Sequence, residues 1–306
     1  MSNELHFQLV IAMSDILNPL PLEEWPLLRD IIKLESPAYT SYCNWISNAI
    51  IWKTKDPQVN LQIYCPHGKY NSGTFVGIFD HSLYNVVVFA FKSQGEILRK
   101  ALRETRRLDF GKIIYFAFVL DDILPYLIGL LSDLKESRGA EILERIVGNY
   151  YYKSAKDAAA AEIRVPDECY LRPLKESDVA YIHSQWPHRD ERNPETTLNY
   201  LKNLVIFNDE CLGLCLKEDD TLVSWALVND FHALAAVQTR KDYMRRGYAK
   251  LVSLAVAKCL GKQGFDSVLS ILVGNTSSEK MFTSIGYQKI TGSTWLIAKL
   301  CGNSEQ

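Results

Sequence analysis

One turn of the chain has residue types that suit phosphate binding. Val237, Gln238 and Thr239 are typical of a strand end, and a short charged turn leads from them to Gly247 and Ala249 at the start of a helix. The first amide N–H groups of a helix have no partner within it and lie at the positive end of its dipole. Gly247 lets backbone approach a ligand, and Ala249 adds almost no bulk. The sequence therefore predicts a seat for a phosphate or pyrophosphate, with an ordinary helix entry as the alternative.

A second strand and helix follow downstream. The segment 267–273 is typical of a buried strand, and Asn275 can cap the helix that comes after it. Phe282 belongs to the apolar face of this helix, and Gly286 ends it before Tyr287. Two strand–helix units therefore follow each other. The first has the anion seat, and the second has a side-chain amide where its strand stops.

These residues resemble the motifs of the GNAT superfamily of N-acyltransferases. Gly247 and Ala249 match the family's glycine turn, while Asn275, Phe282 and Gly286-Tyr287 match its second unit in the family's order and spacing. The resemblance covers about the last third of the chain. It implies a GNAT fold that binds acyl-CoA or acetyl-CoA as a co-substrate, with no metal.

The resemblance also implies which residues hold the coenzyme. Main-chain groups of Val237, Gln238 and Thr239 would pair with the pantetheine arm. Met244 departs from the family's usual Arg or Gln, but backbone donors do the main work in such a turn and the arginines after it supply charge. The arm and its thioester would be flanked by Asn275, Ser278 and Phe282. Backbone N–H groups for the pyrophosphate would come from Met244, Arg245, Arg246, Gly247, Tyr248 and Ala249.

Acyl transfer to an amine needs a base near the amine and donors aimed at the oxyanion. By the resemblance the base would be a Glu at the position of Ala233, so His232, with an ordinary pKa of about 6.5, is the candidate catalytic residue. A turn histidine in water is the alternative, and Asp230 is the other titratable group nearby. Phe282 stands where the family often has a tyrosine acid, and it cannot donate a proton. Two hypotheses therefore remain: an N-acyltransferase acting on glycine or another small amine, and an acyl-CoA-binding protein with weak or lost catalysis.

An alanine-rich connector near residues 154–166 predicts a boundary between two domains. Residues 166–306 have the strand and helix order of one complete GNAT fold, the expected acyl-CoA-binding domain. Residues 1–165 have a similar order without a glycine turn after the strand at 85–91. This layout resembles the glycine N-acyltransferase branch, in which a degenerate GNAT-like domain comes first. The expected fold class is therefore α/β with a mixed sheet.

Composition sets the remaining bounds. A net charge of −2 gives no reason to expect nucleic acid. Seven scattered cysteines favour reduced thiols in an intracellular compartment, cytoplasmic or mitochondrial, over disulfides or a zinc site. The apolar patch at 7–13 lacks a basic segment before it, so we do not expect a signal peptide, and no run approaches the ~20 apolar residues that span a membrane. The expected partners are the coenzyme and a small amine or amino acid, and the oligomeric state stays open.

Overall fold

The computed structural model describes residues 15–191 and 193–300, so the apolar patch at 7–13 lies outside the described residues. The first half of the described chain forms four α-helices and six strands. Its elements are β1 (Leu17–Pro19), α2 (Trp25–Lys33), α3 (Thr40–Lys55), β2 (Leu61–Pro66), β3 (Phe75–Asp80), β4 (Tyr84–Phe89), α4 (Gly95–Glu104), β5 (Ile114–Leu120), α5 (Leu124–Arg138) and β6 (Ala140–Lys153).

The second half repeats this order after a short helix in the connector. Its elements are α6 (Ala155–Ala159), β7 (Cys169–Pro173), α7 (Glu176–Gln185), α8 (Pro194–Phe207), β8 (Leu212–Leu216), β9 (Leu222–Val228), β10 (Ala233–Thr239), α9 (Tyr248–Lys262), β11 (Ser267–Leu272), α10 (Thr276–Ser284) and β12 (Gln288–Leu300). Each half therefore runs β-α-α-β-β-β-α-β-α-β. The predicted mixed α/β fold class, with a similar order of elements in both halves, is confirmed.

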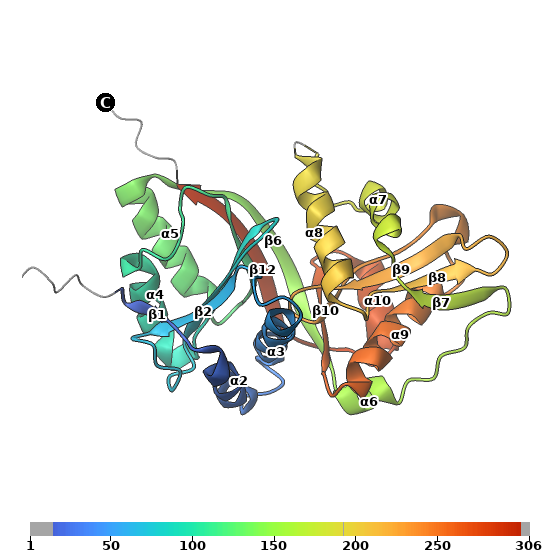
Figure 1. The fold of residues 1–306 in the computed structure, drawn as a ribbon, viewed down its shortest axis with the longest axis horizontal. Coiled ribbons are helices and arrows are strands. Elements are labelled where there is room, and N and C mark those ends of the chain that lie inside the picture. The colour runs from blue at the N-terminus through green and yellow to red at the C-terminus, as the bar shows by residue number, and fades with distance from the viewer. Residues whose placement is uncertain (1–14, 192, 301–306) are drawn as a thin grey trace, which may run out of the picture.

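All twelve strands belong to one continuous sheet, with helices on both of its faces (Figure 1). The strand order is β1-β2-β3-β4-β5-β12-β6-β11-β10-β9-β8-β7. The pairs β4–β5 and β10–β11 are parallel. No helix among the described residues is long and apolar enough to cross a membrane.

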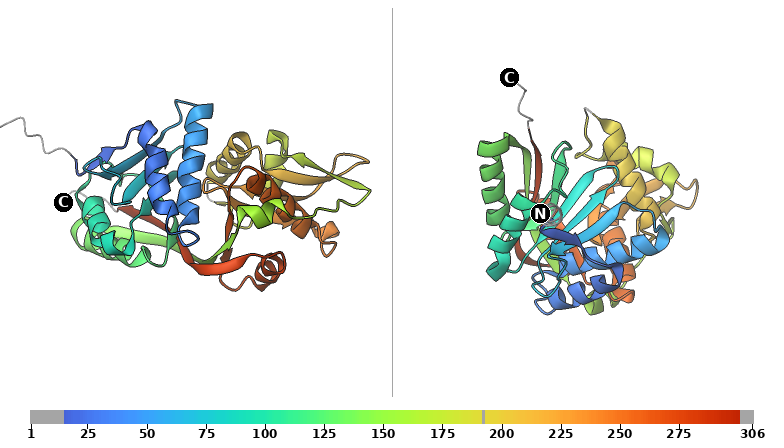
Figure 2. Two further views of the ribbon diagram at one scale, coloured as in Figure 1. Left: turned by 90° about the horizontal axis from the view of Figure 1, so that it is seen from below. Right: turned by 60° about the vertical axis from the view of Figure 1, so that its left-hand side comes forward.

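The two halves exchange their last strands. Strand β12 lies between β5 and β6, so Leu296 pairs with Phe116 on one side and with Arg145 on the other. Strand β6 in turn pairs with β11 of the second half, from Ser267↔Lys153 onward. In Figures 1 and 2 the red β12 accordingly runs among the blue and green elements of the first half. The expected domains 1–165 and 166–306 stay a prediction, and the exchange means that neither contains all the strands of its own part of the sheet.

Helix α3 adds a second set of contacts between the halves. Its residues Asn44, Asn48 and Trp52 are spaced by four, so they share one face of the helix. Asn44 donates to the Asp266 carbonyl at 2.9 Å, and Asn48 donates to the Asp230 carbonyl at 3.0 Å. The indole N–H of Trp52 donates to the side chain of Asn208 at 3.3 Å. One helix of the first half thus satisfies polar groups of three separate loops in the second.

The turn between β9 and β10, which α3 contacts, buries two titratable groups. Asp230 is 5% exposed and His232 is 2% exposed. Burial raises the pKa of Asp230 to about 6. Burial, together with the positive charge of Lys55, lowers the pKa of His232 to about 4. Removal from water disfavours the charged form of each group, which moves the two pKa values in opposite directions.

Trypsin should cut the connector without separating the two pieces. The Arg164 side chain is 92% exposed, so the peptide bond after it is the expected site. Because β12 of the second piece lies between β5 and β6 of the first, we expect both fragments to co-elute from gel filtration and to separate only in denaturant. Fragments that elute apart in native buffer would contradict the exchanged-strand arrangement.

Asp230 and His232 should give opposing pH dependences of stability. The raised pKa of Asp230 makes the free energy of unfolding fall as pH rises from about 4 to 6, since the folded state binds the extra proton. The lowered pKa of His232 makes it rise from about 4 to 6.5, since the unfolded state binds the proton. In Asp230→Asn only the His232 effect remains. Between about pH 4 and 6 its free energy of unfolding should therefore rise by about 1–3 kcal/mol more than that of the wild type. Urea unfolding at several pH values measures it, and equal slopes for both proteins would refute it.

Candidate functional site

Strands β10 and β11 separate at the point where a pantetheine arm was expected. Their parallel pairing covers Ala233↔Val268 and Leu234↔Leu269. Beyond it the register of β10 against β9 shifts between Ala235 and Gln238, and Ala236 has a φ of 47°. A bulge of this kind bends the strand and turns its main-chain groups away from the neighbouring strand. The second part of β10 is therefore free to pair with a ligand instead of β11.

The end of β10 is held in place from the β9 side. The Ser224 hydroxyl donates to the Gln238 carbonyl at 2.8 Å and lies 2.9 Å from the Thr239 hydroxyl. The Gln238 side chain donates to the Gln185 carbonyl at the end of α7, at 2.8 Å. The sequence did not single out Ser224, although a serine within the apolar run of β9 is a signal for such a role. Val237, Gln238 and Thr239 thus form a fixed, partly exposed strand end.

The turn before α9 has the backbone of an anion seat. Arg245 and Gly247 have φ values of 63° and 79°, and Gly247 is the N-cap of α9. Positive φ values at alternate residues turn successive N–H groups toward one point. A Cβ on Gly247 would meet nothing within 4 Å, so the space above the helix start is open. This open space and the unpaired N–H groups of the first helical turn fit a pyrophosphate.

The side chains of the turn divide between solvent and core. Met244, Arg245 and Arg246 are exposed. Tyr248 is 4% exposed, and its hydroxyl donates to the Glu168 carboxylate at 3.2 Å. Its side chain therefore stabilises the start of α9 against β7, and only its backbone can face a ligand, as can that of Ala249.

Two arginines flank the ring of Tyr243 beside the turn. The Arg246 guanidinium lies 5.1 Å from the ring centroid, and that of Arg240 lies 6.0 Å from it. Arg240 also lies 5.3 Å from the ring of Tyr181 in α7. Cation–π contacts of this kind fix the positions of the guanidinium groups without neutralising them. Arg240 and Arg246 therefore bring positive charge to the Tyr243 side of the turn.

The residues expected to flank the pantetheine arm from β11 and α10 lie only partly where we expected them. The Asn275 side chain accepts a hydrogen bond from the Ser278 N–H at 3.1 Å, which makes it the N-cap of α10. Asn275 and Ser278 thus lie together just after the end of β11. Phe282 is 4% exposed and packs edge-on against Tyr287, with 5.3 Å between the ring centroids. The Phe282 side chain therefore belongs to the core, and the structure does not favour its expected contact with the thioester.

The His232 side chain is buried, so it is not placed as a solvent-accessible base. Its imidazole packs edge-on against Phe265 with 4.4 Å between the ring centroids. It precedes β10, and Val237 lies five residues later, beyond the start of the bulge. The pKa of His232 is lowered to about 4, which makes the imidazole a weak base. The alternative of a turn histidine in water is equally unsupported, since the side chain is only 2% exposed.

The first half has no matching anion seat at the equivalent place. There β4 leads through Phe91 into α4, whose first residue is Gly95. A Cβ on Gly95 would lie 2.1 Å from the Tyr126 ring, and the Tyr126 hydroxyl donates to the Lys92 carbonyl at 3.2 Å. Tyr126 of α5 therefore covers the start of α4, where a phosphate would need to sit.

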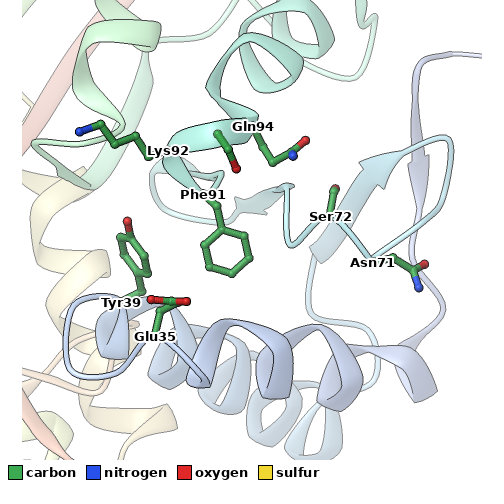
Figure 3. A pocket seen from close by; sticks show the side chains of 8 residues that line it. Glu35, Tyr39, Asn71, Ser72, Phe91, Lys92 and Gln94 are labelled. Atoms are coloured by element: carbon green, nitrogen blue, oxygen red, sulfur yellow. The ribbon is translucent and has the colours of Figure 1, made fainter.

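A cavity of about 710 Å³ lies beside the segment that connects β4 to α4 in the first half (Figure 3). Tyr39 and Phe91 lie in it, and the Tyr39 hydroxyl donates to Asp122 at 3.1 Å. Its other lining groups combine one acidic, one basic and several neutral polar side chains, which gives no strong preference for an anion. They are Glu35, Asn71, Ser72, Lys92, Ser93 and Gln94.

In the part of the chain that the structure describes, no side chains are grouped as a metal site, and the cysteines form no disulfide. No three side chains of His, Cys, Asp and Glu come together there as metal ligands. The six cysteines within this part are free thiols, and burial raises the pKa of Cys211 to about 12 and that of Cys215 to about 11. These two are therefore packed thiols.

Known proteins share both the second-half motif and the whole arrangement. The family model described as FR47-like protein matches residues 211–296. A solved structure of a Drosophila protein is 25% identical, covers 95% of this chain and 100% of its own, and has a TM-score of 0.81. A GCN5-related N-acetyltransferase from Sphaerobacter thermophilus is 11% identical, with coverage of 95% and 97% and a TM-score of 0.49. A tandem GNAT protein from the clavulanic acid biosynthesis pathway is 10% identical, with coverage of 94% and 100% and a TM-score of 0.49.

The family model covers β8 to β12, the stretch that holds the diverging strands, the turn and Asn275. The motif match and the strand arrangement thus agree on the same residues. The chain is therefore similar to FR47-like proteins over residues 211–296, and to the Drosophila protein over its whole arrangement.

Proposed function

We propose that this protein is an acyl-CoA-dependent N-acyltransferase that acylates glycine or another small amine. The observation that carries the proposal is the combination of diverging strands and an open anion seat. The pairing of β10 with β11 ends at Leu234, and the turn with Gly247 follows at the end of β10. A long ligand with an anionic end and an amide-bearing arm fits such a site. Acyl-CoA has this shape.

The residues of the chain would hold the coenzyme mainly by their backbone. N–H groups of 244–249 would bind the pyrophosphate, and the helix dipole of α9 would add to the attraction. Main-chain groups of Val237–Thr239 would pair with the amides of the pantetheine arm. Asn275 and Ser278 would lie on the other side of the arm. When bound, the coenzyme supplies the activated acyl group.

The same strand can serve the reaction. As the amine attacks the thioester carbonyl, negative charge develops on its oxygen, and an N–H of the bulged part of β10 can donate to it. The C–S bond then breaks, and coenzyme A leaves as a thiolate that takes up a proton. The amine must also lose a proton. Because His232 is buried and its pKa is lowered to about 4, we propose that this proton leaves through water. The glycine acceptor itself rests on the resemblance of the first half to the glycine N-acyltransferase layout.

An acyl-CoA-binding protein with weak or no catalysis is the second candidate. It is favoured by the burial of the two side chains nearest to the family's acid and base positions, Phe282 and His232. Thiol release from several acyl-CoA donors, with and without amino-acid acceptors, separates the two functions. Acceptor-dependent release supports the enzyme. Binding of acyl-CoA without release from any pair would favour the second candidate.

Gly247→Asp should weaken binding of acetyl-CoA by at least about tenfold, because a carboxylate and a Cβ would both oppose the pyrophosphate. Calorimetry measures the affinity. Gly264→Asp is the matched control, since Gly264 also has a positive φ, 85°, and open space around its Cβ position. If both variants bind like wild type, or both lose binding equally, the seat is not at Gly247.

His232→Ala should leave turnover per folded molecule within a few-fold of wild type. The expected cost is in stability, since the imidazole fills a buried site against Phe265. Thermal unfolding and initial rates on the same sample separate the two effects. A fall in turnover of ~10²–10⁴ with unchanged coenzyme affinity would instead establish His232 as the base.

A further inference from the structure

The cavity in the first half lies where three separate segments of the chain meet (Figure 3). They are the loop before α3, the loop before β3 and the segment between β4 and α4. The first supplies Tyr39, the second Ser72 and the third Phe91. The volume of about 710 Å³ falls within the roughly 300–1,000 Å³ that is typical of small-molecule sites. Its lining residues are all separate from those of the candidate coenzyme site.

Hydrogen bonds and close packing hold two of these segments in place. The Gly73 N–H donates to the Tyr70 carbonyl at 2.8 Å, and the Gln94 N–H donates to the Phe91 carbonyl at 2.7 Å. A Cβ on Gly73 would lie 2.4 Å from the Phe91 ring, so the two segments are in close contact. This part of the cavity wall is therefore formed without a ligand, as in most small-molecule sites.

Two aromatic rings give the cavity an apolar wall. The Phe91 ring packs edge-on against the Tyr39 ring, with 5.9 Å between the centroids. Both rings also pack edge-on against Phe89 of β4, at 5.1 Å for Tyr39 and 5.2 Å for Phe91. Phe89 is fully buried, so this wall is continuous with the core. Phe91 is only partly buried, which lets an apolar group of a ligand pack against it.

Negative charge gathers at the Tyr39 side of the cavity. The Tyr39 hydroxyl donates to the Asp122 carboxylate at 3.1 Å, and Figure 3 shows Glu35 beside Tyr39. Burial, together with the carboxylates of Asp122 and Glu35, raises the pKa of Tyr39 to about 12. The hydroxyl is therefore protonated at neutral pH and keeps donating to Asp122. The Glu35 carboxylate remains to accept from an ammonium group.

The segment between β4 and α4 brings the opposite charge. Lys92 and Ser93 are exposed there, and both line the cavity. Among the described residues, neither Lys92 nor Glu35 makes an ion pair, so the two charges do not neutralise each other. A simple anion or a simple cation would leave one of them unused. A ligand that carries both charges can engage both.

We infer that this cavity binds an amino acid with an apolar side chain. Its ammonium group would bind Glu35, its carboxylate would bind Lys92 and Ser93, and its side chain would pack on Phe91. Glu35 and Lys92 are long, exposed side chains, so both can reach a ligand between them. The inference goes beyond the proposed function and does not depend on it, because it concerns the half that has no anion seat.

The test compares L-phenylalanine with two analogues that each lack one charge. Phenethylamine has no carboxylate, and 3-phenylpropionate has no ammonium group. Calorimetry on the full chain should show that Glu35→Gln and Lys92→Gln each weaken phenylalanine binding by about fivefold or more. Lys92→Gln should change phenethylamine binding by less than about twofold, since the lost contact is absent there. Glu35→Gln should have the same small effect on 3-phenylpropionate.

Glu136→Gln and Lys135→Gln are the matched controls. Both side chains are exposed on α5 outside the cavity, and their loss changes the net charge equally. Gly247→Asp should bind phenylalanine like wild type, which separates this cavity from the proposed coenzyme site.

Three results would overturn the inference. They are no binding of phenylalanine to the wild-type protein, equal weakening by the control variants, and phenethylamine binding as tight as that of phenylalanine. Phenylalanine binding that survives unchanged in Glu35→Gln and Lys92→Gln would also overturn it, since the amino acid would then lie elsewhere in the molecule. All of these results leave acyl-CoA binding at Gly247 untouched, so the proposed function stands or falls separately.

Discussion

The antiparallel pairing of β6 with β12 ties the molecule together. Each of these strands is the last of its own half, yet β12 fills the place beside β5 and β6 fills the place beside β11. Twelve residue pairs join the two strands, from Gln288↔Tyr152 to Leu300↔Ala140. Since every buried N–H and carbonyl needs a partner, neither β5 nor β11 keeps a satisfied edge without the other half. The halves are therefore parts of one sheet, and α3 adds polar contacts to the same junction.

The two halves share an architecture but differ at the one place where a ligand would enter. In both halves a helix connects two parallel strands: α4 connects β4 to β5, and α9 connects β10 to β11. In the second half the approach to α9 is a long turn with positive φ at Gly247 and open space above it. In the first half Tyr126 covers the start of α4. One aromatic side chain thus separates a covered helix start from an accessible one, although the backbone order is the same.

The junction also explains why polar residues are buried far from any ligand. Asp230 and His232 lie in a turn that the second half must present to α3, and the main-chain carbonyl of Asp230 is satisfied by Asn48. Their side chains are buried in this turn, and their pKa values move apart as a result. Perturbed titration here reflects burial in the packed interior. It is no sign of catalysis by itself.

Local features of the site could be predicted from the sequence. The turn at 244–249, the cap at Asn275 and the strands around them follow from glycine, capping residues and hydrophobic periodicity, all of which act within a few residues. The repeated order of elements in the two halves was predictable for the same reason. Ser224 had a local signal too, a serine within an apolar strand.

Only the tertiary structure decided which strands are neighbours and which side chains face the ligand. Nothing local in 288–300 tells that it pairs with β5 of the other half, because an apolar strand pairs equally well with several partners. Phe282 matched a site position by spacing and His232 lay next to one, yet the side chains of both are buried. Phe282 packs against Tyr287, and His232 packs against Phe265. The composition of residues 154–166 predicted a connector between domains. In the structure this segment lies along α9, because Ala155 and Ala158 fit closely against Gly261. Backbone geometry near a glycine is a local property of the chain, whereas the burial of a side chain depends on what the rest of the fold places against it.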